Sequence, residues 1–178
     1  PTSIGSLTNL TSLSMSDTSL SGPIPTTIGS LTALQSIYLE TSQFTSIPNS
    51  IGNLNSVTVL HVNNNKIGGT IPSTLGNMSS LENLHLYSNQ FTGNLPTSIV
   101  NLGSVLIYLD VSFNSLSTPI PSEVGLLLSL STLLMNDNQI HGTIPTLFGA
   151  MSSLTYMNLR YNAINGTIPG TLGLIPNL

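Results

Sequence analysis

Three side chains that could do chemistry stand at matching positions of successive segments of this chain. His61 is followed by His85 after 24 residues and by Asp110 after 25 more. On adjacent strands, these side chains would lie about 5 Å apart, within reach of one metal ion. No residues that would orient such ligands can be identified, so we favour stacked imidazoles on a solvated sheet. The carboxylates are scattered and no nucleophile with a base stands out. We therefore expect no metal, no cofactor and no enzyme activity.

The elements that must position these side chains are copies of a 24-residue repeat. Its pattern reads L-x-x-L-x-L-x-x-N-x-L-x-G-x-I-P-x-x-L-G-x-L-x-x. Seven copies align on the position that favours Asn, namely Thr18, Ser42, Asn65, Asn89, Asn114, Asn138 and Asn162. Self-similarity at such a period is the signature of a solenoid. We therefore treat residues 1–178 as a single solenoid domain of about seven repeats.

Each copy begins with a short segment in which apolar residues alternate. Leu60 and Val62 form one such pair, and Leu84 and Leu86 form the next. Alternation with a period of two places each pair on one face of a strand. Stacked copies are expected to form a parallel sheet on the concave side, with strands about 4.8 Å apart.

The remaining repeat positions predict how the chain turns. An Asn amide carries donors and acceptors, so an Asn ladder can pair the peptide groups of adjacent repeats that would otherwise be buried unpaired. Thr18 and Ser42 offer only a hydroxyl, so we expect the amino-terminal turns to be held less firmly. The G-x-I-P segment predicts a bend and a corner, followed by a single 3-10 or helical turn on the convex side.

Two copies depart from the period. The segment 44–48 is one residue shorter than its counterpart 67–72, and the segment 102–109 has one residue too many before its strand. We expect the extra residue to bulge ahead of the concave face, which leaves the direction of Tyr108 open. Such changes of length in solenoids fall in loops.

Composition restricts the possible partners. Only 4% of the residues are charged, the net charge is −4, and Lys66 and Arg160 are the only basic residues. Nucleic acid and anionic membrane surfaces are therefore not expected as partners. No apolar run approaches the roughly 20 residues of a membrane helix. The chain starts and stops within a repeat and lacks recognisable caps, which suggests a piece of a longer array or copies that stack end to end.

The repeat resembles the plant-type leucine-rich repeat, because its Asn is followed by L-x-G-x-I-P in copy after copy. That family includes ectodomains of plant receptor kinases and receptor-like proteins, and polygalacturonase-inhibiting proteins. The resemblance implies a right-handed α/β superhelix, an extracellular setting and recognition of a ligand on the inner or lateral surface. The chain departs from the family in having no cysteine-paired caps and unusually few charges.

Aromatic and charged residues concentrate at the outward strand positions, whereas the other faces are mainly Ser, Thr, Asn and Gly. Exposed aromatic anchors often mark interfaces, although variable strand positions can also carry whatever is soluble. We take the following residues as the candidate ligand-binding set: Tyr38, Glu40, His61, Asn63, His85, Tyr87, Asp110, Phe113, Asn136, Asn158, Arg160 and Tyr161.

Three N-x-S/T sequons begin at Asn9, Asn77 and Asn165. Each is weak evidence alone in a chain rich in Asn, Ser and Thr. All three fall at positions expected to face solvent, which agrees with a secreted glycoprotein.

Three functions compete at this level. The first is an extracellular module that binds a protein, peptide or glycan through its concave or lateral face. The second is a self-assembling filament or a component of the cell wall or extracellular matrix, which the uncapped ends favour. The third is ice binding on a Thr-rich face, although the column that contains Thr70 and Thr143 is interrupted by Asn94 and Pro119.

Overall fold

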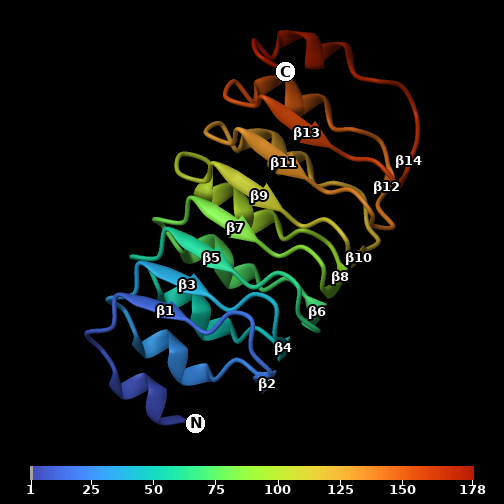
Figure 1. The fold of residues 1–178 in the computed structure, drawn as a ribbon. Helices are drawn as coiled ribbons and strands as arrows, with labels where there is room; N and C mark the ends of the chain where they lie inside the picture. The colour runs from blue at the N-terminus through green and yellow to red at the C-terminus, as the bar shows by residue number, and fades with distance from the viewer. Residues whose placement is uncertain (1) are drawn as a thin grey trace.

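The computed structural model describes residues 2–178. Within that range the chain coils into a solenoid of fourteen short strands and eight 3-10 helices (Figure 1). Each full repeat supplies one strand to the concave sheet, a second strand at the lateral edge, and one 3-10 helix on the convex side. The predicted leucine-rich-repeat solenoid is confirmed.

The concave sheet is parallel, and its seven described strands follow chain order. Inward residues pair in register along the whole sheet, as Leu60 with Leu84 and Leu84 with Leu109. These strands are β1 (Ser12–Ser14), β3 (Ser36–Tyr38), β5 (Val59–His61), β7 (Asn83–His85), β9 (Tyr108–Asp110), β11 (Thr132–Leu134) and β13 (Tyr156–Asn158).

Shorter parallel ladders run along the lateral edge, where the L-x-G-x-I-P segments lie (Figure 1). The register shifts between Gly22 and Pro23, next to the repeat that is one residue short. The strands of this edge are β2 (Ser21–Pro23), β4 (Gln43–Ser46), β6 (Gly68–Thr70), β8 (Gln90–Gly93), β10 (Ser115–Leu116), β12 (His141–Gly142) and β14 (Ala163–Ile164).

A proline precedes each 3-10 helix from the second onward, with φ between −59° at Pro121 and −76° at Pro48. Its fixed φ and missing donor suit the corner that leads into the helix. The helices are η1 (Thr2–Ser6), η2 (Thr26–Ser30), η3 (Asn49–Asn53), η4 (Ser73–Asn77), η5 (Thr97–Leu102), η6 (Ser122–Leu126), η7 (Thr146–Ala150) and η8 (Gly170–Leu174).

Successive 3-10 helices pack closely because a glycine faces the next repeat. A Cβ built on Gly52 would collide with the carbonyl oxygen of Thr74 in η4. A Cβ on Gly125 would lie 2.5 Å from the carbonyl oxygen of Leu147. At these positions the distance between coils requires glycine, because a side chain would push the neighbouring coils apart. In η5 the corresponding residue is Val100, and Gly103 makes the close approach, to the carbonyl oxygen of Leu126.

The lumen between sheet and helices is filled by the leucine positions of the repeat, and Leu60, Leu84, Leu109 and Leu133 have no exposed surface. Five Asn side-chain amides form hydrogen bonds that join adjacent coils. The Asn89 Oδ1 accepts from the Ile67 N–H at 3.0 Å, and its Nδ2 donates to the Val62 carbonyl at 2.9 Å. The same pair of bonds to the preceding repeat recurs at Asn65, Asn114, Asn138 and Asn162.

The first two repeats use hydroxyls at this position. The Ser42 Oγ accepts from the Thr18 N–H at 3.3 Å and donates to the Met15 carbonyl at 3.4 Å. These bonds are longer than those of the Asn ladder, and a hydroxyl cannot span the same pair of peptide groups. The amino-terminal seam is thus the weaker part of the ladder.

The extra residue of the segment 102–109 does not bulge ahead of the concave face, so that expectation was wrong. It is accommodated on the convex side, where η5 has six residues and the other 3-10 helices have five. Tyr108 then begins β9 in register with Asn83 and Thr132. The sheet keeps its register because its ladder and the amide seam both resist an insertion.

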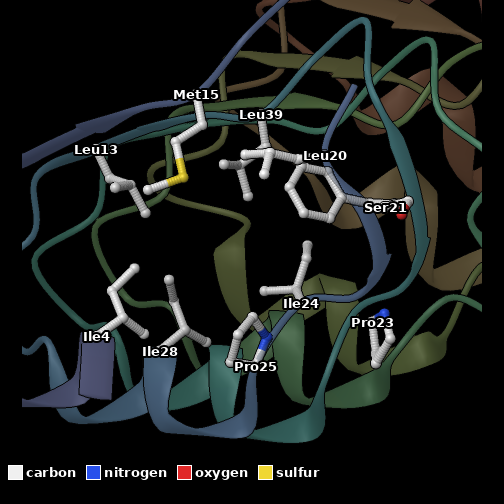
Figure 2. A pocket seen from close by; sticks show the side chains of 11 residues that line it. Ile4, Leu13, Met15, Leu20, Ser21, Pro23, Ile24, Pro25, Ile28 and Leu39 are labelled. Atoms are coloured by element: carbon white, nitrogen blue, oxygen red, sulfur yellow. The ribbon is translucent and has the colours of Figure 1, made fainter. Parts of the chain in front are cut away.

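An apolar cavity of about 260 Å³ lies at the amino-terminal end of the lumen (Figure 2). Leu13 and Met15 point into it from the sheet side, and Ile4 and Ile28 point into it from the helix side. Its walls continue the leucine-filled lumen, so it is packing surface of the coil and carries no arrangement of polar groups suited to catalysis.

Candidate recognition surface on the concave face

A row of rings crosses four adjacent strands of the concave sheet. Tyr38 on β3 meets His61 on β5 edge to face, with ring centroids 5.1 Å apart. His61 and His85 lie 4.0 Å apart, and Tyr108 on β9 stacks on His85 at 4.4 Å. Tyr87 flanks the row with its centroid 6.2 Å from His85. We call these five residues the ring row.

Sequence reasoning omitted Tyr108 from the binding set because the inserted residue left its direction open. The parallel register of β7 and β9 decides it, because Tyr108 pairs with Asn83 and its ring leans over His85. Stacked and edge-to-face ring pairs are mutually stabilising. The ring row is therefore a partly preformed surface of half-buried rings.

Burial sets the ionisation of the row. It lowers the pKa of His85 to about 4, and the nearby His61 lowers it further. Burial also lowers the pKa of His61, although Glu40 acts against this. At neutral pH both imidazoles are consequently uncharged, and the row presents apolar faces with hydrogen-bonding edges.

Next to the ring row, Asp110 is buried, and its carboxylate forms hydrogen bonds within its own repeat. Its Oδ1 accepts from the Ser112 N–H at 2.9 Å and from the Ser112 hydroxyl at 2.6 Å. Burial raises the pKa of Asp110, whereas its hydrogen bonds with Ser112 and Tyr108 lower it. Burial and the proximity of Asp110 raise the pKa of Tyr108 to about 12. Among residues 2–178, no three His, Cys, Asp or Glu side chains come together to hold a metal.

Three members of the candidate set do not offer open contact surface. Asn63, Asp110 and Asn136 are 4%, 5% and 8% exposed. The expectation that every outward strand position faces solvent was too simple for these three.

Phe113 and Tyr161 lie beyond the strands, at a turn position where every repeat has a positive φ. Their φ values are 52° and 53°, a backbone conformation that is unusual for large side chains. This conformation directs both rings outward, and they are 53% and 67% exposed. They are separate contact points at the edge of the concave face and do not extend the ring row.

The carboxyl-terminal end of the face holds its own cluster. The Arg160 guanidinium lies 4.8 Å from the centre of the Tyr161 ring and donates to the Tyr161 hydroxyl at 2.9 Å. The Asn158 Oδ1 accepts from the Arg160 N–H at 3.1 Å. The structure therefore divides the sequence-based set: Tyr38, His61, His85 and Tyr87 belong to the ring row, Asn158, Arg160 and Tyr161 belong to this cluster, and the other members belong to neither.

The sequons lie on other surfaces. Asn9, Asn77 and Asn165 are all exposed, and Asn77 is the last residue of η4 on the convex side. None of the described helices is long and apolar enough to cross a membrane.

A repeat solenoid with a row of half-buried rings on its concave sheet belongs to the class of non-globular repeat scaffolds. A leucine-rich-repeat region matches residues 2–92, and single leucine-rich repeats match residues 105–127, 129–151 and 153–175. The chain belongs to the leucine-rich-repeat family, and its repeats are of the plant type. No curated protein matches the sequence.

Solved structures agree with this assignment. The plant peptide hormone receptor RGFR1, in complex with RGF2, is 36% identical with a TM-score of 0.97, over 100% of this chain and 28% of that chain. The ectodomain of the Arabidopsis thaliana receptor kinase GASSHO1/SCHENGEN3, in complex with CASPARIAN STRIP INTEGRITY FACTOR 2, is 34% identical with a TM-score of 0.97, over 100% and 21%.

A leucine-rich-repeat protein of Leptospira interrogans is 30% identical with a TM-score of 0.84, over 100% of this chain and 44% of that chain. The chain thus spans about a quarter of the length of the two plant receptors and under half of the bacterial protein.

Proposed function

We propose that this chain is an extracellular recognition module that binds a peptide or an extended protein segment across its concave face. The observation that carries the proposal is the ring row, in which Tyr38, His61, His85 and Tyr108 contact one another across four strands. Rigid aromatic side chains give contact area at little cost in conformational entropy, and they dominate the energetics of many interfaces.

The row suits an extended ligand that runs across the strands. Four strands at about 4.8 Å spacing give a platform roughly 15 Å long, which matches about four residues of extended chain. Uncharged imidazoles and tyrosines can stack on apolar or aromatic ligand side chains and hydrogen-bond the ligand backbone at their edges. The two plant receptors named above were solved with RGF2 and with CASPARIAN STRIP INTEGRITY FACTOR 2, which supports a ligand on this kind of scaffold.

An extracellular and glycosylated state is part of this proposal. Its support is the exposure of Asn9, Asn77 and Asn165, together with the similarity to a receptor ectodomain. The proposal is of a binding module and includes no enzyme activity.

A display experiment tests the binding proposal. The chain is used to select from a library of random twelve-residue peptides, and each enriched peptide is measured against Tyr38→Ala and His85→Ala variants. We expect the Kd to rise at least tenfold, because truncating an aromatic anchor typically costs more than about 1.4 kcal/mol. Leu128→Ala, at an exposed convex position, is the matched control and should leave the Kd unchanged.

The proposal fails if no peptide is enriched, or if the enriched peptides bind the concave variants as well as the wild type. Filament formation and ice binding remain separate hypotheses. Sedimentation velocity at high concentration tests the first, and inhibition of ice recrystallisation tests the second.

A further inference from the structure

A second row of polar side chains lies beside the ring row, and its oxygens lack partners. The Glu40 Oε2, Asn63 Oδ1 and Ser16 Oγ are buried, and none forms a hydrogen bond with any residue of 2–178. Asn63 is 4% exposed as a residue. Buried polar atoms are normally paired, and each exception needs an explanation. We call these three residues the Glu40 row.

The sheet aligns the three residues that carry these oxygens. β3 and β5 pair Tyr38 with His61, so Glu40 and Asn63 occupy the same column two residues further on. The Thr41 N–H donates to the Asn63 carbonyl, which carries this register past the strand ends. The Asp17 N–H likewise donates to the Glu40 carbonyl, which places Ser16 beside Glu40. Three residues on consecutive coils thus share one column.

Within residues 2–178, no Lys or Arg side chain donates to this row. The chain's only two basic side chains are engaged elsewhere, because the Lys66 Nζ donates to the Gln43 Oε1 at 3.1 Å on the lateral edge. Arg160 is bonded to Tyr161 after β13, at the other end of the sheet. A carboxylate and an amide oxygen without donors are suited to a group that brings several N–H donors and positive charge.

The neighbouring rings suit the same group. Tyr38 and His61 occupy the adjacent column on the same two strands, with their centroids 5.1 Å apart. The face of a tyrosine ring attracts a cation that lies within about 6 Å. His61 adds no competing charge, because burial keeps its pKa below the ordinary value.

We propose that the Glu40 row receives the guanidinium or ammonium group of a basic side chain of the bound peptide, with Glu40 as the counter-ion, and that the buried side chains of Asn63 and Ser16 turn towards this group to supply further acceptors. This inference rests on the proposed function and names the chemistry of one ligand position. The basic residue occupies the β1–β5 end of the concave face, and the rest of the peptide continues over the ring row towards β9.

The test uses acetyl-arginine-methylamide as the probe and acetyl-citrulline-methylamide as its uncharged isostere. Each is titrated into isotope-labelled protein, and the backbone amide resonance of residue 63, which the Asn63→Asp variant retains, is followed by NMR. We expect saturable shifts with the arginine probe at roughly millimolar Kd and none with the citrulline probe. Glu40→Gln should weaken the arginine probe at least about tenfold. Glu82→Gln makes the same change of charge at an exposed position and should leave the Kd unchanged.

For a second variant we expect the opposite change in affinity for the arginine probe. Asn63→Asp adds a carboxylate beside Glu40 and should tighten the arginine probe several-fold. If the Asn63 amide is instead rotated so that its Nδ2 donates to Glu40, Asn63→Asp will weaken the probe, and the inference is overturned. Equal binding of both probes, or indifference to Glu40→Gln, also overturns it. So does a calcium titration that shifts the Asn63 resonance when the arginine probe does not, because the row would then be a metal site.

This outcome is separable from that of the proposed function. Peptides that are selected by the concave face and lost in His85→Ala, yet bind Glu40→Gln normally, would retain the recognition proposal and reject the basic residue.

Discussion

The rings of His61 and His85 lie 4.0 Å apart on adjacent strands, tilted by 52°. This contact joins β5 to β7 on the outward side of the sheet and continues through Tyr108 to β9. The two histidines therefore belong to a row of rings. Their packing is that of stacked imidazoles, the alternative that the sequence favoured over a metal site. The consequence is that both imidazoles resist protonation, because burial lowers the pKa of each and the nearby His61 lowers the pKa of His85 further.

The first prediction concerns pH. The pKa of His85 is about 4 in the folded chain against an ordinary 6.5, so the unfolded chain binds more protons between these values. The contribution of His85 to stability is fully present above about pH 6.5 and is lost as the pH falls towards 4. Because His85 is partly exposed, we reduce the expected effect: between pH 7 and pH 4.5 the free energy of unfolding should fall by about 1 kcal/mol more in the wild type than in His85→Gln.

Urea denaturation of both proteins at the two pH values measures this difference. The comparison cancels the opposite contribution of Asp110, whose pKa is raised by burial and which is present in both proteins. His141→Gln alters an exposed lateral histidine and serves as the control. Identical pH dependence of wild type and His85→Gln would contradict the packing of the ring row.

The second prediction concerns the amide ladder. Asn89→Ala removes the acceptor of the Ile67 N–H and the donor to the Val62 carbonyl. The Ile67 N–H is then left inside the coil without a partner, whereas the Val62 carbonyl keeps the bond that it accepts from the Asn65 Nδ2 at 3.1 Å. We therefore expect the free energy of unfolding to fall by roughly 1 to 3 kcal/mol. Asn83→Ala, at an outward position of β7, should change stability by less than about 1 kcal/mol.

An amide placed in the amino-terminal part of the ladder, where hydroxyls now stand, should raise the free energy of unfolding. Ser42→Asn supplies the amide that the amino-terminal turn lacks, and we expect a gain of up to about 1 kcal/mol in urea denaturation. A loss of stability would show that the Thr18 and Ser42 hydroxyls are the better fit at this end of the coil.

The third prediction concerns the distance between coils. Gly52→Ala places a methyl group against the Thr74 carbonyl, and only a shift of η3 against η4 can relieve the collision. We expect a loss of about 1 to 3 kcal/mol, measured by thermal and urea denaturation. Gly173→Ala occupies the corresponding position of η8 and meets no described atom within 4 Å, so it should be neutral or slightly stabilising. Equal effects of the two substitutions would refute the packing argument.

The fourth prediction concerns the sequons. Expression through a eukaryotic secretory pathway should add glycans at Asn9, Asn77 and Asn165, because all three side chains are exposed. Each Asn→Gln substitution should then remove one glycan mass in intact-protein mass spectrometry. Asn55→Gln, an exposed Asn outside any sequon, is the control and should change no glycan mass. A secreted protein with no added mass would contradict the glycoprotein expectation.

Several features of this molecule could be read from the sequence because they recur. The period places Leu60, Leu84 and Leu109 in one inward column, and the sheet has that register. It also places His61 beside His85. A solenoid makes this possible because residues one repeat apart become neighbours in space, so sequence distance translates directly into contact.

Other features could be decided only by the tertiary structure, because they depend on how side chains of neighbouring columns share space. Tyr108 lies in the ring row because the inserted residue is accommodated on the convex side, where η5 has six residues. Asn63 is buried and its Oδ1 has no hydrogen-bond partner, although the repeat pattern places this residue on the outward side. A repeat pattern specifies the column and side of a residue. Its exposure and hydrogen bonds depend on the size, rotamer and charge of neighbours on adjacent coils, and these vary from one repeat to the next.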